Sequence, residues 1–199
     1  MFRKTLITTA TLAAVMSAAS AFAAPVENKD FGGGTITFTG SVTNAPCSID
    51  PNDEKLTVNL GQVSMKQLSE KDKTSDPVDI KIHLNSCQFE ATTTSPPNPD
   101  YGQLSKVDVM FDNYNSASAA TGILNNDGSA TNVGIQLLDA SGKPVNLTTT
   151  PTASTAHQLT GATGELTFKA RMINNAAATG SSAGAGTVAA TVNYKLKYF

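Results

Sequence analysis

The chain has 199 residues, with 14 Lys and Arg against 16 Asp and Glu, and its formal net charge is −2. It has neither an excess nor a cluster of basic residues, so the composition argues against nucleic acid or anionic lipid as a partner. Thr, Ala, Gly, Val and Asn are frequent and Trp is absent, which favours strands and turns over helices.

The first 23 residues have the pattern of a signal peptide. Arg3 and Lys4 precede an apolar stretch at residues 6–16, and Ala21-Phe22-Ala23 has the small-x-small form of a signal-peptidase site. We expect cleavage after Ala23, which removes two positive charges and leaves a net charge of about −4. The apolar stretch is too short to span a bilayer, so we expect the mature chain to be exported and soluble.

A loose segment precedes the first alternating stretch. Residues 24–34 are polar and Gly-rich, and we expect them to be disordered in an isolated chain. Residues 35–45 then alternate at period two, which predicts a strand. One face of it carries Ile36, Phe38, Gly40 and Val42, and the other carries Thr and Ser.

The only two cysteines, Cys47 and Cys87, both lie in the exported part. In an oxidising compartment such a pair predicts a disulfide. The bond closes a loop of about 40 residues, which stabilises the fold by roughly 4 kcal/mol in the chain-entropy view. The alternative is a metal or redox site, for which two thiols without nearby His ligands are poorly suited.

Further alternating stretches follow along the chain, separated by turn signals. Residues 64–76 are charged and lack strand alternation, and residues 64–70 are compatible with a short helical turn. Residues 95–99 form a Pro-rich loop that no strand interior tolerates. Asn125-Asn126-Asp127-Gly128 is a strong turn signal. The expected strands are residues 56–60, 78–84, 107–111, 133–137 and 166–172.

The last expected strand covers residues 187–199. Its apolar or aromatic positions run from Val188 to Tyr198 and alternate with mostly polar ones. No later segment can pair with this strand, so one of its edges stays open unless an earlier segment covers it, and open edges invite pairing with another chain. Together the seven or eight short strands predict an all-β, immunoglobulin-like antiparallel sandwich.

No catalytic or cofactor chemistry is visible in the sequence. His83 and His157 are far apart, and two histidines do not build a copper or zinc site without carboxylate help. There is neither a Gly-x-Ser-x-Gly nucleophile elbow nor a phosphate-binding loop. We therefore expect no enzyme activity, metal or cofactor.

Several motifs in order resemble one protein family across the whole mature chain. They are Gly33-Gly34-Thr35-Ile36-Thr37-Phe38-Thr39-Gly40, Asn44-Ala45-Pro46-Cys47, Val58-Asn59-Leu60-Gly61-Gln62-Val63, Ile82-His83-Leu84-Asn85-Ser86-Cys87, residues 130–139, Phe168-Lys169-Ala170-Arg171, and an ending with Gly186 fourteenth from the end and Tyr198 next to last. This combination resembles the chaperone–usher pilins, in particular the major structural subunits of type 1-like fimbriae.

The resemblance implies an incomplete sandwich that lacks its last strand and is completed by donor-strand exchange. Pilin strand complementation is an established form of strand addition. Residues 24–38 are then the N-terminal donor-strand extension, within a donor segment of about residues 28–40, and residues 39–199 are the pilin domain. Gly34, Ile36 and Phe38 are expected to face the acceptor's core, whereas Val42 is expected to belong to the domain's own first strand.

The resemblance also assigns an acceptor groove along the final strand, which first binds a periplasmic chaperone. The terminal carboxylate of Phe199 is expected to contact basic residues of that chaperone, although related chains mostly end in a polar residue. The residues assigned to groove and chaperone binding are Gly186, Val188, Val192, Tyr194, Leu196, Tyr198 and Phe199.

The function implied is that of a structural subunit of a surface fimbria that supports cell adhesion. Its partners would be copies of itself, other pilins, the chaperone and an outer-membrane usher, and it would reach the cell surface through the periplasm. A minor adaptor pilin and a receptor-binding subunit (adhesin) are the alternatives. Tip adhesins of this family carry an extra domain and lack a donor extension, which favours the structural subunit.

Overall fold

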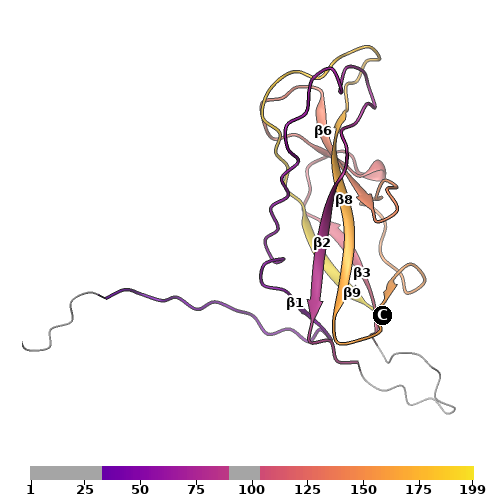
Figure 1. Ribbon diagram of the computed structural model, residues 1–199. Coiled ribbons are helices and arrows are strands. Elements are labelled where there is room, and N and C mark those ends of the chain that lie inside the picture. The colour runs from indigo at the N-terminus through magenta and orange to yellow at the C-terminus, as the bar shows by residue number, and fades with distance from the viewer. Residues whose placement is uncertain (1–32, 90–103) are drawn as a thin grey trace, which may run out of the picture. The chain divides into compact units, whose positions relative to one another are not determined.

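The computed structural model describes residues 33–89 and 104–199 (Figure 1). Contacts divide the chain into two units, Met1–Val42 and Thr43–Phe199. In the first unit the described residues form no strand, and their apolar side chains are exposed: Ile36 is 78% exposed, Phe38 88% and Val42 102%. The strand expected at residues 35–45 is therefore absent, and the assignment of Val42 to the domain's own first strand is wrong.

The second unit is built almost entirely of short strands. Its single helical element is a 3-10 turn among the described residues, and none of these forms a helix long and apolar enough to cross a membrane. The elements are β1 (Ser48–Ile49), β2 (Val78–Asn85), β3 (Lys106–Asp112), β4 (Ser116–Ser118), η1 (Ala119–Thr121), β5 (Ile123–Asn125), β6 (Val133–Asp139), β7 (His157–Gln158), β8 (Gly164–Asn174) and β9 (Asn193–Tyr198).

These strands form two antiparallel sheets. The larger sheet has the order β1-β2-β8-β6-β5-β4 and the smaller one has the order β7-β3-β9. Figure 1 shows β2 and β8 side by side along the length of the larger sheet. The register places Ile82 opposite Leu166 in the larger sheet and Val109 opposite Leu196 in the smaller one. The predicted immunoglobulin-like sandwich is confirmed.

The core lies between the two sheets, where the alternating apolar positions of both meet. Leu84 from the larger sheet and Val107 from the smaller sheet are both 0% exposed and belong to one cluster. Phe111 and Phe168 meet edge to face across the layers, with ring centroids 5.4 Å apart, a favoured geometry for aromatic pairs. Burial of this apolar area is the main stabilising term of the fold.

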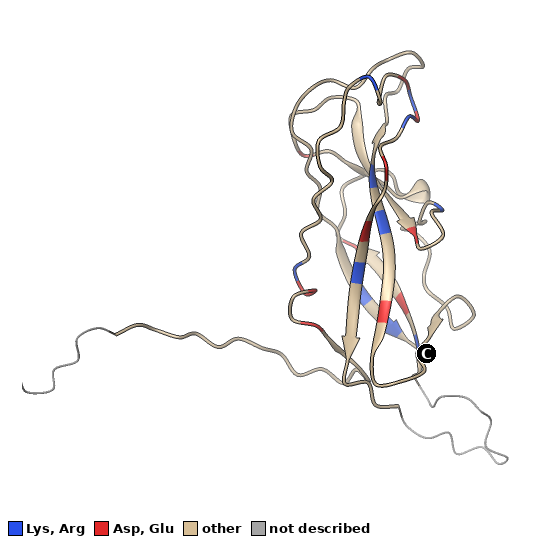
Figure 2. Cartoon of the chain, viewed as in Figure 1, with Lys and Arg blue, Asp and Glu red and all other residues tan. Residues whose placement is uncertain are grey.

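The outer face of β2 and β8 carries the polar half of the alternation. Figure 2 shows positive and negative residues interspersed along both strands. Lys81 Nζ lies 2.9 Å from Glu165 Oε1, and Lys169 Nζ lies 4.0 Å from Asp79 Oδ1. The Lys81 ammonium lowers the pKa of Glu165, and Glu165 in turn raises the pKa of Lys81. Such exposed pairs contribute little to stability, but they keep this face soluble.

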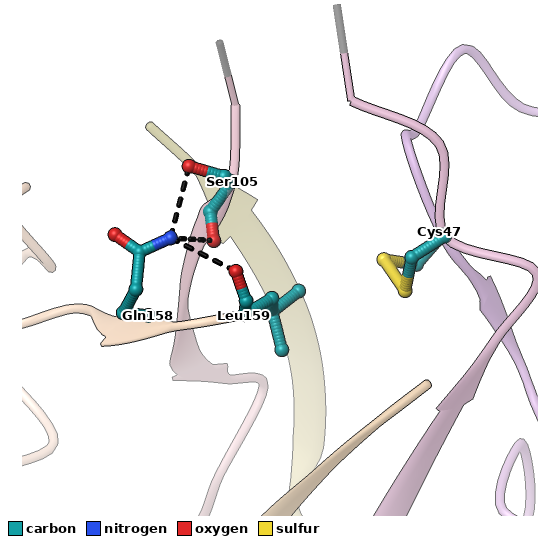
Figure 3. The surroundings of a disulfide bond; sticks show 5 residues. Cys47, Ser105, Gln158 and Leu159 are labelled. Atoms are coloured by element: carbon teal, nitrogen blue, oxygen red, sulfur yellow. Dashed lines mark hydrogen bonds between the residues drawn. A yellow bond between two sulfur atoms is a disulfide. The ribbon is translucent and has the colours of Figure 1, made fainter. Parts of the chain in front are cut away.

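Cys47 and Cys87 form the predicted disulfide, which joins the chain before β1 to the end of β2. Figure 3 shows this bond and, on the other side of the view, the side chain of Gln158 with its bonds to Ser105 and Leu159. Gln158 Nε2 donates to Ser105 O at 3.1 Å, to Ser105 Oγ at 3.0 Å and to Leu159 O at 2.9 Å. Leu159 belongs to the same core cluster as both cysteines, so the bonds of Gln158 help to hold the core at the disulfide end of the sandwich.

Two expected strands have a different structure. Residues 56–60 and 187–192 are extended but belong to no strand, although residues 193–198 form β9. An alternating pattern predicts an extended, half-buried segment, whereas a strand also needs a hydrogen-bonded neighbour. Residues 64–70 contain hydrogen-bonded turns, such as Gln67 N to Ser64 O at 2.9 Å. The loop predicted at residues 95–99 lies outside the described residues.

Candidate functional site

The second unit contains a mainly apolar groove of about 1050 Å³. Two extended segments line it, residues 56–63 and residues 187–192, and both are drawn as coil in Figure 1. The rest of the lining comes mostly from the core faces of both sheets: Ile80, Phe111, Leu124, Val133, Ile135, Leu137, Phe168, Ala170 and Met172. The groove is therefore an opening into the hydrophobic core.

The 56–63 segment has no backbone–backbone hydrogen bond to any residue that the structure describes. Its one local polar contact is Gly61 N, which donates to Asn59 Oδ1 at 2.9 Å, and Gly61 takes a positive φ of 73°. Leu60 and Val63 pack against the buried core near Leu68 and Met172. Leu60 and Val63 thus anchor this segment, while its backbone groups form no bond to another described backbone.

The 187–192 segment shows the same separation between side chains and backbone. Val188, Ala190 and Val192 pack on the core cluster around Leu124 and Ile135. The backbone groups of Val188, Ala190 and Val192 make no backbone hydrogen bond within the described parts of the chain. In an extended chain, alternate residues direct both backbone groups to the same edge. One edge of this segment therefore lacks a neighbour.

The open edge continues into β9, whose only strand neighbour among the described residues is β3. Tyr194 of β9 is the last residue of the chain that lines the groove. Its Oη donates to Asp53 O at 2.8 Å. Burial, and to a smaller extent the charges of Asp53 and Glu54, raise the pKa of Tyr194. The phenol is therefore a neutral donor at physiological pH, and it links β9 to the chain just before the 56–63 segment.

The structure brings four of the seven predicted acceptor residues together at the groove: Gly186, Val188, Val192 and Tyr194. Gly186 is needed for a close approach, because a Cβ there would lie 2.4 Å from Ala130 N. Leu196 and Tyr198 instead pack against the core cluster beside the disulfide.

The last residue, Phe199, also lies outside the groove lining. Its backbone pairs with that of Lys106, with N–H···O distances of 2.9 and 3.1 Å. The predicted donor residues Gly34, Ile36 and Phe38 belong to the other unit, where their extended backbone leaves the apolar side chains exposed. Their placement in a groove stays a prediction.

Sequence reasoning missed two asparagines that shape the groove. Asn174 is 0% exposed, and its Nδ2 donates to Leu68 O at 2.9 Å and to Ser181 O at 2.8 Å, which ties two loops at the upper end of the groove. Asn126 was visible only as part of a turn signal, yet its amide bonds the 187–192 segment. Neither role has a local signal, because both asparagines contact residues distant in the sequence.

The chemistry of the groove suits the binding of an extended chain. Within residues 33–89 and 104–199, no group of three or more His, Cys, Asp or Glu side chains is placed to hold a metal ion. The lining offers apolar side chains together with backbone donors and acceptors that no described backbone group pairs with. These are the groups that an added β-strand engages. Fold and groove thus define a class of protein, the immunoglobulin-like sandwich with an open edge along its final strand.

Known proteins share this architecture. A model of the fimbrial protein family matches residues 36–198. The type-1 fimbrial protein, C chain, of Escherichia coli is 36% identical over 169 residues, which are 83% of this chain and 83% of that protein. The major MR/P fimbria protein of Proteus mirabilis is 33% identical over 169 residues, which are 85% of this chain and 86% of that one.

Among solved structures, a chaperone–usher pilus subunit from a study of rod uncoiling has a TM-score of 0.66 and 25% identity, and the match covers 87% of this chain and 99% of that subunit. The chain belongs to the fimbrial protein family. It is a structural fimbrial subunit that assembles with other pilins into a surface fimbria.

Proposed function

We propose that this subunit polymerises by strand exchange, in which the N-terminal segment of one copy fills the groove of the next. The observation that carries the proposal is the presence of two complementary halves in one chain. One half is an apolar groove bordered by unpaired backbone groups, and the other is an extended segment whose apolar side chains Ile36, Phe38 and Val42 are all exposed.

The donor segment matches the groove in chemistry and in period. Gly34, Ile36, Phe38, Gly40 and Val42 share one face of an extended chain. Burial of Ile36 and Phe38 would each contribute about 1.5–3 kcal/mol, and each ladder hydrogen bond would add about 1 kcal/mol net. The contact boundary after Val42 supports a donor that extends four residues beyond the expected boundary at residue 38.

The same groove must be protected before assembly. An open apolar edge is prone to aggregation, so a folding subunit needs a temporary strand from another protein. We propose that a periplasmic chaperone supplies this strand and that an outer-membrane usher exchanges it for the donor of the next subunit. The predicted signal peptide at residues 1–23 supports the periplasmic route, and so does the likeness to a subunit of a chaperone–usher pilus.

The role that this assembly supports is structural, with neither substrate nor cofactor. The chain's own donor-like segment favours a shaft subunit over a tip adhesin. An adaptor between shaft and tip would need the same two halves, and the position of the subunit in isolated fibres would distinguish the two roles.

A donor-complemented chain tests the proposal. Residues 28–42 are copied after Phe199 through a short flexible linker, in a chain that starts at residue 43. Its thermal unfolding is compared with that of the same chain without the copy. We expect a soluble monomer with a much higher melting temperature, because the copy covers the groove and pairs with both lining segments.

A matched control carries Ile36→Asp and Phe38→Asp within the copied segment. The control keeps the length and the linker but cannot place charged side chains in the apolar groove. Equal melting temperatures for the complemented chain, the control and the uncomplemented chain would mean that the sandwich is already complete, and strand exchange would be rejected.

A further inference from the structure

We propose that the side chain of Asn126 positions the acceptor edge of the groove. It holds the first part of the 187–192 segment so that the backbone groups of Val188 and Ala190 are left free for an incoming strand. The inference rests on the proposed strand exchange and adds a residue that acts on the groove without lining it.

The amide of Asn126 uses all of its hydrogen-bonding positions. Its Nδ2 donates to Ala130 O at 2.8 Å and to Thr187 O at 3.2 Å. Its Oδ1 accepts from Gly128 N at 2.9 Å and from Ala189 N at 2.8 Å. A carboxamide has two N–H donors and an oxygen with two lone pairs, so none of its capacity is left over.

The side chain of Asn126 binds the 187–192 segment beyond the end of the ladder between β3 and β9. The smaller sheet pairs β3 with β9 only as far as Asp112 opposite Asn193. Beyond that point, Asn126 donates to Thr187 O and accepts from Ala189 N, as the backbone of a neighbouring strand would do. The loop of residues 126–130 also makes two backbone hydrogen bonds to this segment, from Asp127 N to Ala189 O at 2.8 Å and from Ala130 N to Thr187 O at 3.0 Å.

These bonds set the direction of the backbone groups in the 187–192 segment. The backbone groups of Thr187 and Ala189 are bonded to the 126–130 loop. In an extended chain, the backbone groups of the alternate residues Val188 and Ala190 therefore point to the opposite edge. Without Asn126, the segment would keep the bonds of Asp127 N, Ala130 N and Ser129 Oγ but lose the side-chain bonds to Thr187 O and Ala189 N. The donor would then have to order more of the segment on binding, and binding would carry that entropic cost. A preformed edge binds more tightly than one ordered on contact.

The neighbouring residue provides a matched control. The Nδ2 of Asn125 donates to Asn115 Oδ1 at 2.6 Å, and this side chain makes no hydrogen bond to the 187–192 segment among the described residues. Asn125→Ala and Asn126→Ala therefore remove the same group from adjacent positions, and only the second should affect the acceptor edge.

The test measures binding of a fluorescent peptide of residues 33–43 to the chain from residue 24. Ile36→Asp and Phe38→Asp in the chain's own extension prevent self-assembly. We expect Asn126→Ala to weaken peptide binding about tenfold, since two hydrogen bonds to the acceptor edge are lost. Asn125→Ala should stay within about twofold of the parent.

Amide hydrogen exchange provides the readout that a general loss of stability would not give. In Asn126→Ala, the Ala189 amide should exchange much faster, while the Phe199 amide, bonded to Lys106 O at 2.9 Å, should keep its protection. Asn126→Asp keeps the Oδ1 acceptor for Ala189 N, so this variant should retain protection at Ala189 and bind the peptide with intermediate affinity.

The outcomes separate the two proposals. If the parent does not bind the peptide, the groove is not a strand acceptor and strand exchange fails. If the parent binds the peptide, and Asn126→Ala binds it equally well with unchanged exchange at Ala189, the positioning role is rejected. If Asn126→Ala does not fold, Asn126→Asp decides the role, because unchanged affinity in this folded variant would overturn it.

Discussion

The hydroxyl of Tyr194 donates to the backbone carbonyl of Asp53 at 2.8 Å, and this bond ties the final strand to the chain that leads into the other lining segment of the groove. Asp53 is 6% exposed, and its carboxylate accepts from His83 N at 2.6 Å. Contacts from two distant parts of the chain thus converge on one buried residue, and they fix the end of the groove.

We predict that Tyr194→Phe destabilises the domain by about 1 kcal/mol, because it leaves a carbonyl acceptor without its partner. The measurement is urea unfolding of the chain from residue 24, with Ile36→Asp and Phe38→Asp present to prevent assembly. Tyr198→Phe is the matched control: the Tyr198 hydroxyl is buried without a hydrogen-bond partner among the described residues, so its removal should not lower stability. A larger loss in Tyr198→Phe than in Tyr194→Phe would contradict this assignment.

The buried phenol of Tyr198 should also make the domain less stable at alkaline pH. Burial raises the pKa of Tyr198 to about 12 from its usual 10.0. Below pH 10 the phenol is protonated in both states and its contribution is fully present. Between about pH 10 and about 12, the unfolded chain loses this proton first, so the free energy of unfolding falls.

The check compares urea unfolding at about pH 9 and about pH 11 in the parent and in Tyr198→Phe. The variant should lose less stability over this interval, and the remaining loss should include that of Tyr194, whose pKa is also raised. Thiol exchange does not interfere, because both cysteines are in the disulfide. An equal loss in both proteins would show that Tyr198 ionises normally.

The alternation of side chains identified the strands that build the core. Val78–Asn85 and Gly164–Asn174 form ladders where the sequence predicted them, because each has a partner strand in the same chain. The same pattern at residues 56–60 and 187–192 yields only extended coil. Sequence periodicity reports which side chains are buried, but it carries no information about which chain supplies the neighbouring strand.

Other parts of the fold have no periodic signal. β4, at Ser116–Ser118, consists of small residues and joins β5 through a register shift, so it resembles a loop in sequence. Asn126 lies 61 positions from Thr187, which its amide bonds. A turn motif predicts the local backbone conformation, whereas the contact that matters for the groove exists only after the chain has folded.

Gly186→Ala should destabilise the domain and weaken assembly. A Cβ at this position would lie 2.4 Å from Ala130 N and 2.6 Å from Ser129 C, so the backbone of the 187–192 segment would have to move. We expect a loss of about 1–3 kcal/mol, typical of overpacking, measured by urea unfolding. Gly161→Ala is the control, because nothing lies within 4 Å of a Cβ there; similar losses in both variants would point to a general effect of replacing glycine.

Substitutions in the N-terminal segment should stop assembly without affecting the sandwich. Ile36 and Phe38 are exposed and belong to the unit that ends at Val42, so charging them costs the isolated domain nothing. In the groove of a neighbouring subunit, however, an aspartate at either position would be buried without a partner. We expect Ile36→Asp to abolish surface fibres, as seen by electron microscopy, while its melting temperature as a monomer stays that of the parent.

Thr37→Asp carries the same charge on the opposite face of the extended segment, where it should remain in solvent. Fibres should therefore form in Thr37→Asp, and fibres of normal length in Ile36→Asp would exclude this face of the segment as the donor.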